Sequence, residues 1–179
     1  MERPNPNCYW VVPGQVLAGE YPRNIDTQSS LAKLQAYLDA GVSYFLDLTE
    51  QGELASYVEL LPEFSSNGKP VVHHRFPIPD KSIPSSAQVM RQILTAIRSA
   101  CEEGHAVYVH CWGGVGRTGT VIGCLLVEHG ASPTEALEQL EMLWQTVAKV
   151  SRHPRSPETS AQRQWVSSWE AQAAELTHS

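Results

Sequence analysis

The chain has 179 residues, of which 42% are apolar, and its formal net charge is −6. This length fits one compact domain over residues 1–179, with enough apolar material for a core. The acidic balance and the lack of a basic stripe argue against a nucleic-acid binder, and no apolar run approaches the roughly 20 residues that cross a bilayer.

The first half of the chain predicts a hairpin, one helix and two buried strands. Pro13-Gly14 is typical of a tight turn between two short strands. Asp26 or Thr27 is a suitable cap for a helix that ends at Gly41. The predicted elements are strands over residues 10–12 and 16–18, a helix up to residue 41, a strand over 44–48, a helical turn over 53–61 and a strand over 71–76.

The second half alternates helices with one more strand. Ser85 or Ser86 can cap an amphipathic helix, and Ser132-Pro133 opens another. The predicted elements are a helix that ends at residue 104, a buried strand over 106–110, a helix over 117–129, a helix that begins at 133 and a final helix from about 157. This order predicts an α/β fold with a central, mostly parallel, twisted sheet of about four to five strands flanked by helices.

One stretch between the 106–110 strand and the next helix has the composition of a phosphate cradle. Glycines allow successive N–H groups to point inward, and the helix N-terminus adds unpaired amides and the positive end of its dipole. The planar guanidinium of Arg117 matches two phosphate oxygens. The predicted phosphate-binding residues are Trp112, Gly113, Gly114, Val115, Gly116 and Arg117.

Cys111 stands at the start of this loop, where nearby positive charge favours a nucleophilic thiolate. Thr118 can hydrogen-bond the sulfur or stabilise it as it leaves, and His110 is expected to brace the loop backbone. A buried core cysteine is the alternative, but it explains neither Arg117 nor the glycines. A nucleotide-binding loop is a further alternative, although the GxGxxG and Walker patterns are missing.

The pattern His-Cys-x5-Arg-Thr, at residues 110–118, resembles the signature of the protein tyrosine phosphatase superfamily, particularly its short dual-specificity-like and bacterial-type members. The resemblance extends from about residue 12 to residue 169. It implies the phosphatase fold and hydrolysis of phosphotyrosine, with phosphoserine and phosphothreonine as further substrates, through a phosphocysteine intermediate. It also implies that neither a cofactor nor a metal is needed.

The family uses an aspartate on a separate, earlier loop as the general acid. Asp80 lies 31 residues before Cys111, and prolines on both sides restrict its loop. The implied roles are attack on phosphorus by Cys111, and protonation of the leaving oxygen by Asp80, which then accepts a proton from water. A turn-forming aspartate is the alternative for Asp80. Asp47 is a competing candidate, but its place in an apolar strand favours a structural role.

Two further features of the sequence leave alternatives open. The stretch 158–165 resembles the glutamine loop of larger family members, with Glu158 at the first glutamine position and Gln162 at the second. A capped helix that buries Trp165 and Trp169 is the alternative. Trp112 is either a ligand-facing aromatic or a packing residue.

The expected partner is a phosphorylated protein or peptide, bound by a monomer without nucleic acid or membrane. A cytoplasmic location is expected, because no apolar run is long enough to cross a bilayer and the first residues lack the apolar core of a signal peptide. The four cysteines show no metal-ligand spacing. The alternatives are a small-molecule phosphatase acting on inositol phosphates or nucleotides, and a phosphate-binding module without turnover. A sulfurtransferase and an arsenate reductase are further alternatives, but neither reaction gives Asp80 an obvious chemical role.

Overall fold

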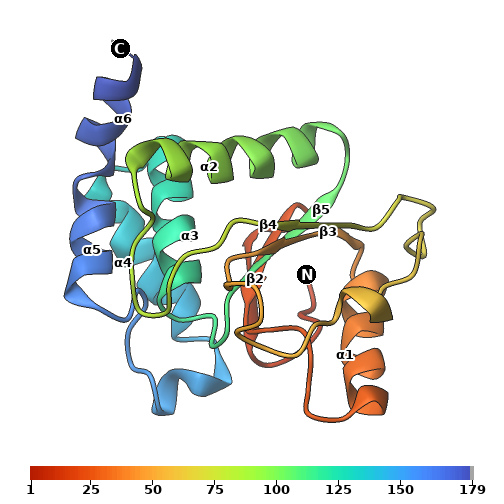
Figure 1. Cartoon of the computed structure of the whole chain (residues 1–179). Coiled ribbons are helices and arrows are strands. Elements are labelled where there is room, and N and C mark those ends of the chain that lie inside the picture. Colours follow the sequence, from red (N-terminus) through yellow and green to blue (C-terminus); the bar gives the residue numbers. More distant parts are fainter. Residues whose placement is uncertain (178–179) are drawn as a thin grey trace.

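A sheet with the strand order β1-β2-β5-β3-β4 forms the centre of the computed structural model (Figure 1), which describes residues 1–177. Only β1 runs antiparallel to its neighbour, β2. The strands are β1 (Cys8–Val12), β2 (Val16–Gly19), β3 (Val42–Asp47), β4 (Val72–Arg75) and β5 (Ala106–His110). The predicted mostly parallel sheet and the predicted hairpin are confirmed, whereas residues 178–179 of the predicted domain lie outside the described part.

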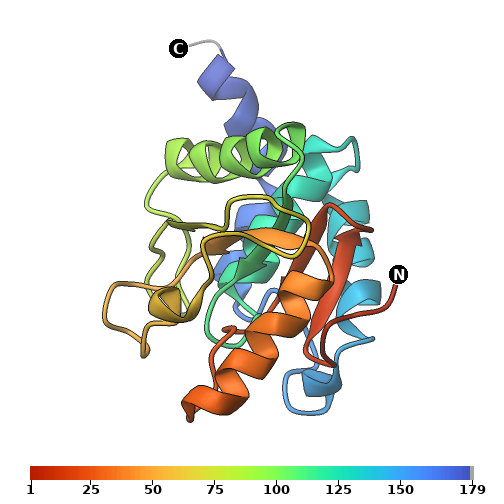
Figure 2. The same cartoon turned by 90° about the vertical axis from the view of Figure 1, so that its right-hand side faces the viewer.

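Helices cover both faces of the sheet, and Figures 1 and 2 show α1 apart from the group formed by α2 to α6. The helices are α1 (Thr27–Asp39), α2 (Ala87–Glu102), α3 (Arg117–Glu128), α4 (Pro133–Trp144), α5 (Ser160–Ser167) and α6 (Trp169–Thr177), with short 3₁₀ turns η1 (Val58–Leu60) and η2 (Ala148–Ser151).

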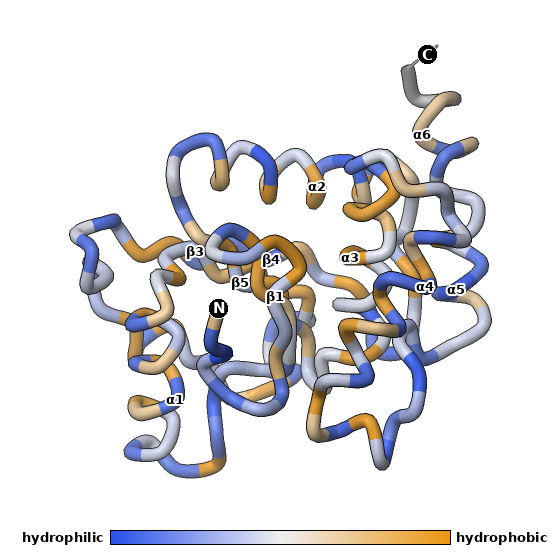
Figure 3. Tube along the Cα trace, turned by 180° about the vertical axis from the view of Figure 1, so that it is seen from behind, coloured by the Kyte–Doolittle hydropathy of each residue, from blue (hydrophilic) through white to orange (hydrophobic). Residues whose placement is uncertain are grey.

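Each strand alternates its side chains between two separate cores. Phe45 and Tyr108 pack with Leu34 and Tyr37 of α1, whereas the opposite face packs against α2 to α5. Figure 3 shows α2 with hydrophobic residues on the side toward the strands and hydrophilic residues on its outer side. Of the described helices, none is both long and apolar enough to cross a membrane.

Side-chain caps begin the helices near the predicted residues. Asp26, not Thr27, caps α1 and accepts from the Ser29 N–H at 2.8 Å. Ser86, not Ser85, caps α2, and Ser132 forms a capping box that opens α4. These local hydrogen bonds explain why helix starts could be predicted from the sequence.

Two predicted helical segments were wrong in extent. The turn over residues 53–61 is helical only in η1. The region predicted as one final helix contains two, α5 and α6. Thr159 and Gln162 form a capping box that starts α5 at residue 160. The hydroxyl of Ser168 donates to the carbonyls of Gln164 and Trp165, 3.0 and 3.1 Å away. Such side-chain bonds compete with the helical ladder and help to end α5 there.

The register of the parallel strands brings four loops to one edge of the sheet. His110 at the end of β5 lies opposite Gly19 of β2 and Asp47 of β3, and Asp47 lies opposite Arg75 of β4. The loops that follow β2, β3, β4 and β5 therefore meet at the carboxyl ends of the strands, where open α/β sheets bind ligands.

Candidate active site

The loop between β5 and α3 forms the floor of a pocket of about 280 Å³. Cys111 lies at its base with 3% of its surface exposed. The lining residues are Asp80, Lys81, Cys111, Trp112, Gly113, Val115, Gly116, Arg117, Lys149, His153 and Glu158. The pocket thus contains the predicted nucleophile, the predicted acid and the predicted phosphate-binding residues except Gly114.

Gly114 supports the loop from behind instead of lining the pocket. Its φ of +75° is one that L side chains rarely adopt. A Cβ at this position would lie 2.5 Å from the carbonyl carbon of Gly19 and 2.8 Å from the backbone nitrogen of Glu20. The loop therefore rests directly on the end of β2, and this close approach requires glycine.

Arg117 is almost completely buried and has acceptors on two sides. Glu53 accepts from Nη1 at 2.8 Å and from Nη2 at 2.6 Å. The carbonyl oxygen of Ile78 accepts from Nη1 at 3.0 Å, and Asp80 accepts from Nη2 at 3.0 Å. The hydrogen bonds from Arg117 hold the pKa of Glu53 below its ordinary value. A guanidinium has five N–H donors, and these contacts use four of them. The Nε–H is therefore left for a ligand, and a ligand could also replace Asp80 at its Nη2 donor.

The loop that carries Asp80 is held in place over the pocket. Ser82 N–H donates to the Pro79 carbonyl at 3.0 Å, which closes a turn, and Lys81 within it has a φ of 56°. Gln162 donates to the Ser82 carbonyl at 2.9 Å, so α5 anchors the same turn. The Asp80 side chain itself is 47% exposed, which leaves its carboxyl group open to a ligand.

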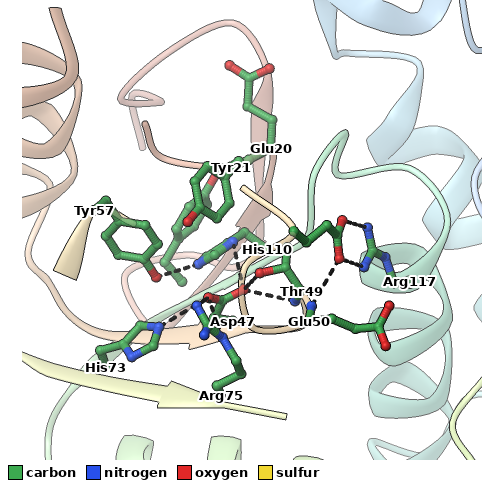
Figure 4. A network of polar contacts seen from close by, with 12 residues as sticks. Glu20, Tyr21, Asp47, Thr49, Glu50, Tyr57, His73, Arg75, His110 and Arg117 are labelled. Carbon is green, nitrogen blue, oxygen red and sulfur yellow. Dashed lines mark hydrogen bonds and ion pairs between the residues drawn. The ribbon is translucent and has the colours of Figure 1, made fainter. Parts of the chain in front are cut away.

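A buried polar network lies beneath the loop (Figure 4) and centres on Asp47. Asp47 is fully buried and accepts from His73 at 3.1 Å, from Arg75 at 2.8 Å and from the Thr49 hydroxyl at 2.7 Å. Burial alone would raise the pKa of Asp47, but the hydrogen bond from His73, the nearby His110 and the Thr49 bonds hold it well below its usual range. These saturated contacts agree with the predicted structural role.

His110 is the link between this network and the loop. Its Nε2 lies 2.7 Å from the Tyr57 hydroxyl, its Nδ1 lies 3.9 Å from Asp47, and its carbonyl accepts from Leu48 N–H at 2.9 Å. Burial lowers the pKa of His110 to about 4. The ring is hydrogen-bonded through Nε2 alone, since Nδ1 has no hydrogen-bond partner among the described residues, and its bracing of the loop stays a prediction.

The remaining residues that the sequence singled out are either buried or at the edge of the pocket. Thr118 is buried, and its hydroxyl has no hydrogen-bond partner in the described part of the chain, so its role stays a prediction. Gln162 is buried in its capping box, whereas Glu158 lines the pocket. Trp112 is 57% exposed at the pocket rim, which agrees with the ligand-facing alternative.

Sequence reasoning missed Glu53, Tyr57 and Lys149. Lys149 forms an ion pair of 2.5 Å with Glu20 and lies 3.4 Å from the Gly113 carbonyl. Glu53 follows a buried strand at the edge where parallel strands end, which is a weak signal of a site. The sequence contains no cue for Tyr57 or Lys149, because each acts across more than thirty residues of chain.

Residues 5–166 match the family described as "Swiss Army Knife protein, DSP-PTPase phosphatase domain". The crystal structure of Tk-PTP in its active form superposes with a TM-score of 0.72 at 25% identity, over 93% of this chain and 97% of that one.

Two curated relatives are similar in sequence. A protein named as a tyrosine phosphatase, 067L of Invertebrate iridescent virus 3, is 28% identical over 160 residues, which is 86% of this chain and 58% of that protein. Cyclin-dependent kinase inhibitor 3 of Rattus norvegicus is 30% identical over 108 residues, 56% of this chain and 48% of that protein. The chain thus spans about half the length of these relatives.

Proposed function

Because the chain belongs to the DSP-PTPase phosphatase domain family, we propose that it is a cysteine-dependent phosphatase. It hydrolyses phosphotyrosine monoesters, with phosphoserine and phosphothreonine as further substrates. The observation that carries this proposal is the pocket that holds Cys111, Arg117 and Asp80 together, although Asp80 comes from a loop 31 residues earlier.

The proposed reaction has two steps. The Cys111 thiolate attacks phosphorus, and Asp80 gives its proton to the leaving oxygen as the phosphorus–oxygen bond breaks. Water then attacks the phosphocysteine, Asp80 takes a proton from that water, and inorganic phosphate leaves with the thiolate restored. The loop amides and Arg117 stabilise the negative charge that develops on the oxygens in both steps.

Arg117 binds phosphate through the two donors that Glu53 and Ile78 leave available. The Nη2 donor is now bonded to Asp80, so phosphate replaces Asp80 at that position. The displacement frees the Asp80 carboxyl group for the leaving oxygen. Support comes from the geometry of Nη1, whose two bonds to Glu53 and Ile78 leave it no donor for the ligand.

The whole chain, residues 1–179, acts in this proposal as one catalytic domain and as a monomer in the cytoplasm. Its partner is a phosphorylated protein or peptide rather than nucleic acid or a membrane. The described residues include no group of three His, Cys, Asp or Glu side chains that could hold a metal ion.

The test is hydrolysis of p-nitrophenyl phosphate in excess chelator. Cys111→Ser is expected to abolish turnover, and Asp80→Ala to slow it about a hundredfold. Cys101→Ser and Asp39→Ala are matched controls, since both residues lie outside the pocket, and they are expected to keep wild-type rates. A folded wild-type protein without turnover, or one that loses activity in chelator, would contradict the proposal.

Substrate class is decided by a second comparison. Phosphotyrosine and phosphoserine peptides are assayed beside inositol phosphates and nucleotides at equal concentration. A protein phosphatase is expected to show the highest kcat/KM for the phosphotyrosine peptides, whereas faster turnover of the soluble metabolites would contradict the proposed substrate.

A further inference from the structure

Trp112 separates two hollows on the surface of the molecule. It lines the pocket of Cys111 and also a neighbouring groove of about 720 Å³. The groove is lined by Tyr21, Arg23, Asn24, Ile25, Asp26, Ser29, Leu54, Ala55 and Trp112. A chain whose phosphorylated residue enters the pocket can therefore continue past Trp112 into the groove.

The groove is built on the same framework as the phosphate-binding loop. The Tyr21 N–H donates to the Trp112 carbonyl at 2.9 Å, and the Tyr21 ring packs edge-on against His110 and Tyr57. The Tyr21 hydroxyl donates to the Ala55 carbonyl at 3.1 Å, which joins the two walls of the groove. The groove is thus preformed, and a ligand does not have to order it.

Most polar side chains of the groove are already paired within the protein, although the Nε of Arg23 is buried without a hydrogen-bond partner among the described residues. The guanidinium of Arg23 donates to the Ser56 carbonyl and pairs with Glu59 at 3.0 Å. Asp26 is engaged as the cap of α1 through Ser29. What the groove offers to a ligand is therefore mainly its apolar surface, made by Ile25, Leu54, Ala55 and Trp112.

Two of these apolar side chains are unusually open to solvent. Ile25 is fully exposed, at 104% of its reference surface, and Trp112 is 57% exposed. Scattered exposed apolar residues are ordinary, but apolar residues grouped around a hollow beside a reactive pocket are typical of ligand-binding grooves.

On this basis we propose that the groove binds a bulky apolar side chain of the substrate, close to the phosphorylated residue of an extended peptide. The inference rests on the proposed phosphatase function and adds to it a preference for the flanking sequence. Because an extended chain advances about 3.3 Å per residue and the two hollows share Trp112, the apolar residue lies within about three positions of the phosphorylated one.

The test compares phosphotyrosine peptides that carry one leucine in an otherwise glycine- and serine-rich sequence. The leucine is moved through the three positions on each side of the phosphotyrosine, and kcat/KM is measured against the same peptide with glycine there. The wild-type protein is expected to prefer leucine at one or two positions on one side by about tenfold.

Ile25→Ser is the variant that reports on the groove, and Met142→Ser is its matched control. Met142 is 65% exposed on α4 and lines neither hollow. The readout is the leucine-to-glycine ratio of kcat/KM for each protein, which cancels any change in the chemical step. The ratio is expected to fall at least threefold in Ile25→Ser and to stay at the wild-type value in Met142→Ser.

Each contrary outcome has a distinct meaning. If p-nitrophenyl phosphate is hydrolysed but no leucine position is preferred, the groove inference is overturned and the phosphatase function stands. If that assay shows no turnover, both are overturned. The inference is also overturned if Ile25→Ser keeps the wild-type peptide preference while it abolishes binding to phospholipid vesicles or self-association, because the exposed surface then serves a membrane or a second copy of the chain.

Discussion

The carboxylate of Glu53 holds the guanidinium of Arg117 through two hydrogen bonds, of 2.8 and 2.6 Å. The two residues are 64 positions apart in sequence, and they meet because the loop after β3 and the start of α3 lie at the same edge of the sheet. This contact occupies one Nη1 and one Nη2 donor, so Nε and the second Nη2 donor are not used by Glu53.

Glu53→Gln is expected to lower kcat/KM about tenfold, because the amide can accept only one of the two bonds and its NH2 group faces a donor. The loss should be accompanied by weaker inhibition by inorganic phosphate, which reports on Arg117 directly. Glu50→Gln, at an exposed position in the same loop, is the control. An unchanged inhibition constant for phosphate in Glu53→Gln would contradict the orienting role.

Gly114→Ala is expected to destabilise the protein by about 2 kcal/mol and to lower activity strongly, since the new Cβ would meet the backbone of Gly19 and the φ is positive. Gly113→Ala is the comparison within the same loop. Its Cβ would meet only the Val115 side chain, at 3.3 Å, so it should fold nearly normally. Thermal unfolding measures the stability of both variants, and the midpoint is expected to be lower for Gly114→Ala. Equal midpoints would show that the contact between Gly114 and β2 does not contribute to stability.

Asp47→Asn is expected to lower the free energy of unfolding by about 3 kcal/mol, because it removes the buried negative charge that pairs with His73 Nε2 and with the guanidinium of Arg75. Urea denaturation measures this change. Asp39→Asn, an exposed carboxyl group on α1, should be nearly neutral. If Asp47→Asn were as stable as the wild type but inactive, Asp47 would have to be reassigned from a structural to a catalytic role.

Acid should destabilise the protein through His110 before it affects Asp47. The pKa of His110 is about 4 in the fold and about 6.5 in an unfolded chain, so between these values the unfolded state binds a proton that the folded state does not. The free energy of unfolding therefore falls as the pH drops through this window, by up to about 1.4 kcal/mol per pH unit. The pKa of Asp47 is held low, so its contribution is present above its unfolded value and is lost only at still lower pH.

Urea denaturation of the wild type and of His110→Gln across that pH window checks this prediction. Glutamine keeps a polar partner for Tyr57 but does not titrate, so the variant should show a shallower dependence on pH. Equal slopes for the two proteins would indicate that His110 is not the group that takes up the proton.

Local features of the sequence were sufficient for much of the fold. The caps Asp26, Ser86 and Ser132 act within three residues of themselves, so their helices could be predicted from neighbouring residues alone. Competition by Ser168 with the helical ladder was not predictable in the same way, because serine is common inside helices, and the final helix was therefore predicted as one instead of two.

In the candidate site, too, contacts between neighbouring residues could be predicted and contacts between distant residues could not. By itself, the sequence determined the loop from His110 to Thr118 and the strand and helix around it, since the conformation of contiguous residues depends on short-range sterics and hydrogen bonds. Only the tertiary structure decided that Glu53 holds Arg117, that Asp47 ties β3 to β4 and that Trp112 stands exposed between two hollows. These contacts join residues far apart in the chain, and they depend on the strand register, which fixes the loops that meet at the edge of the sheet.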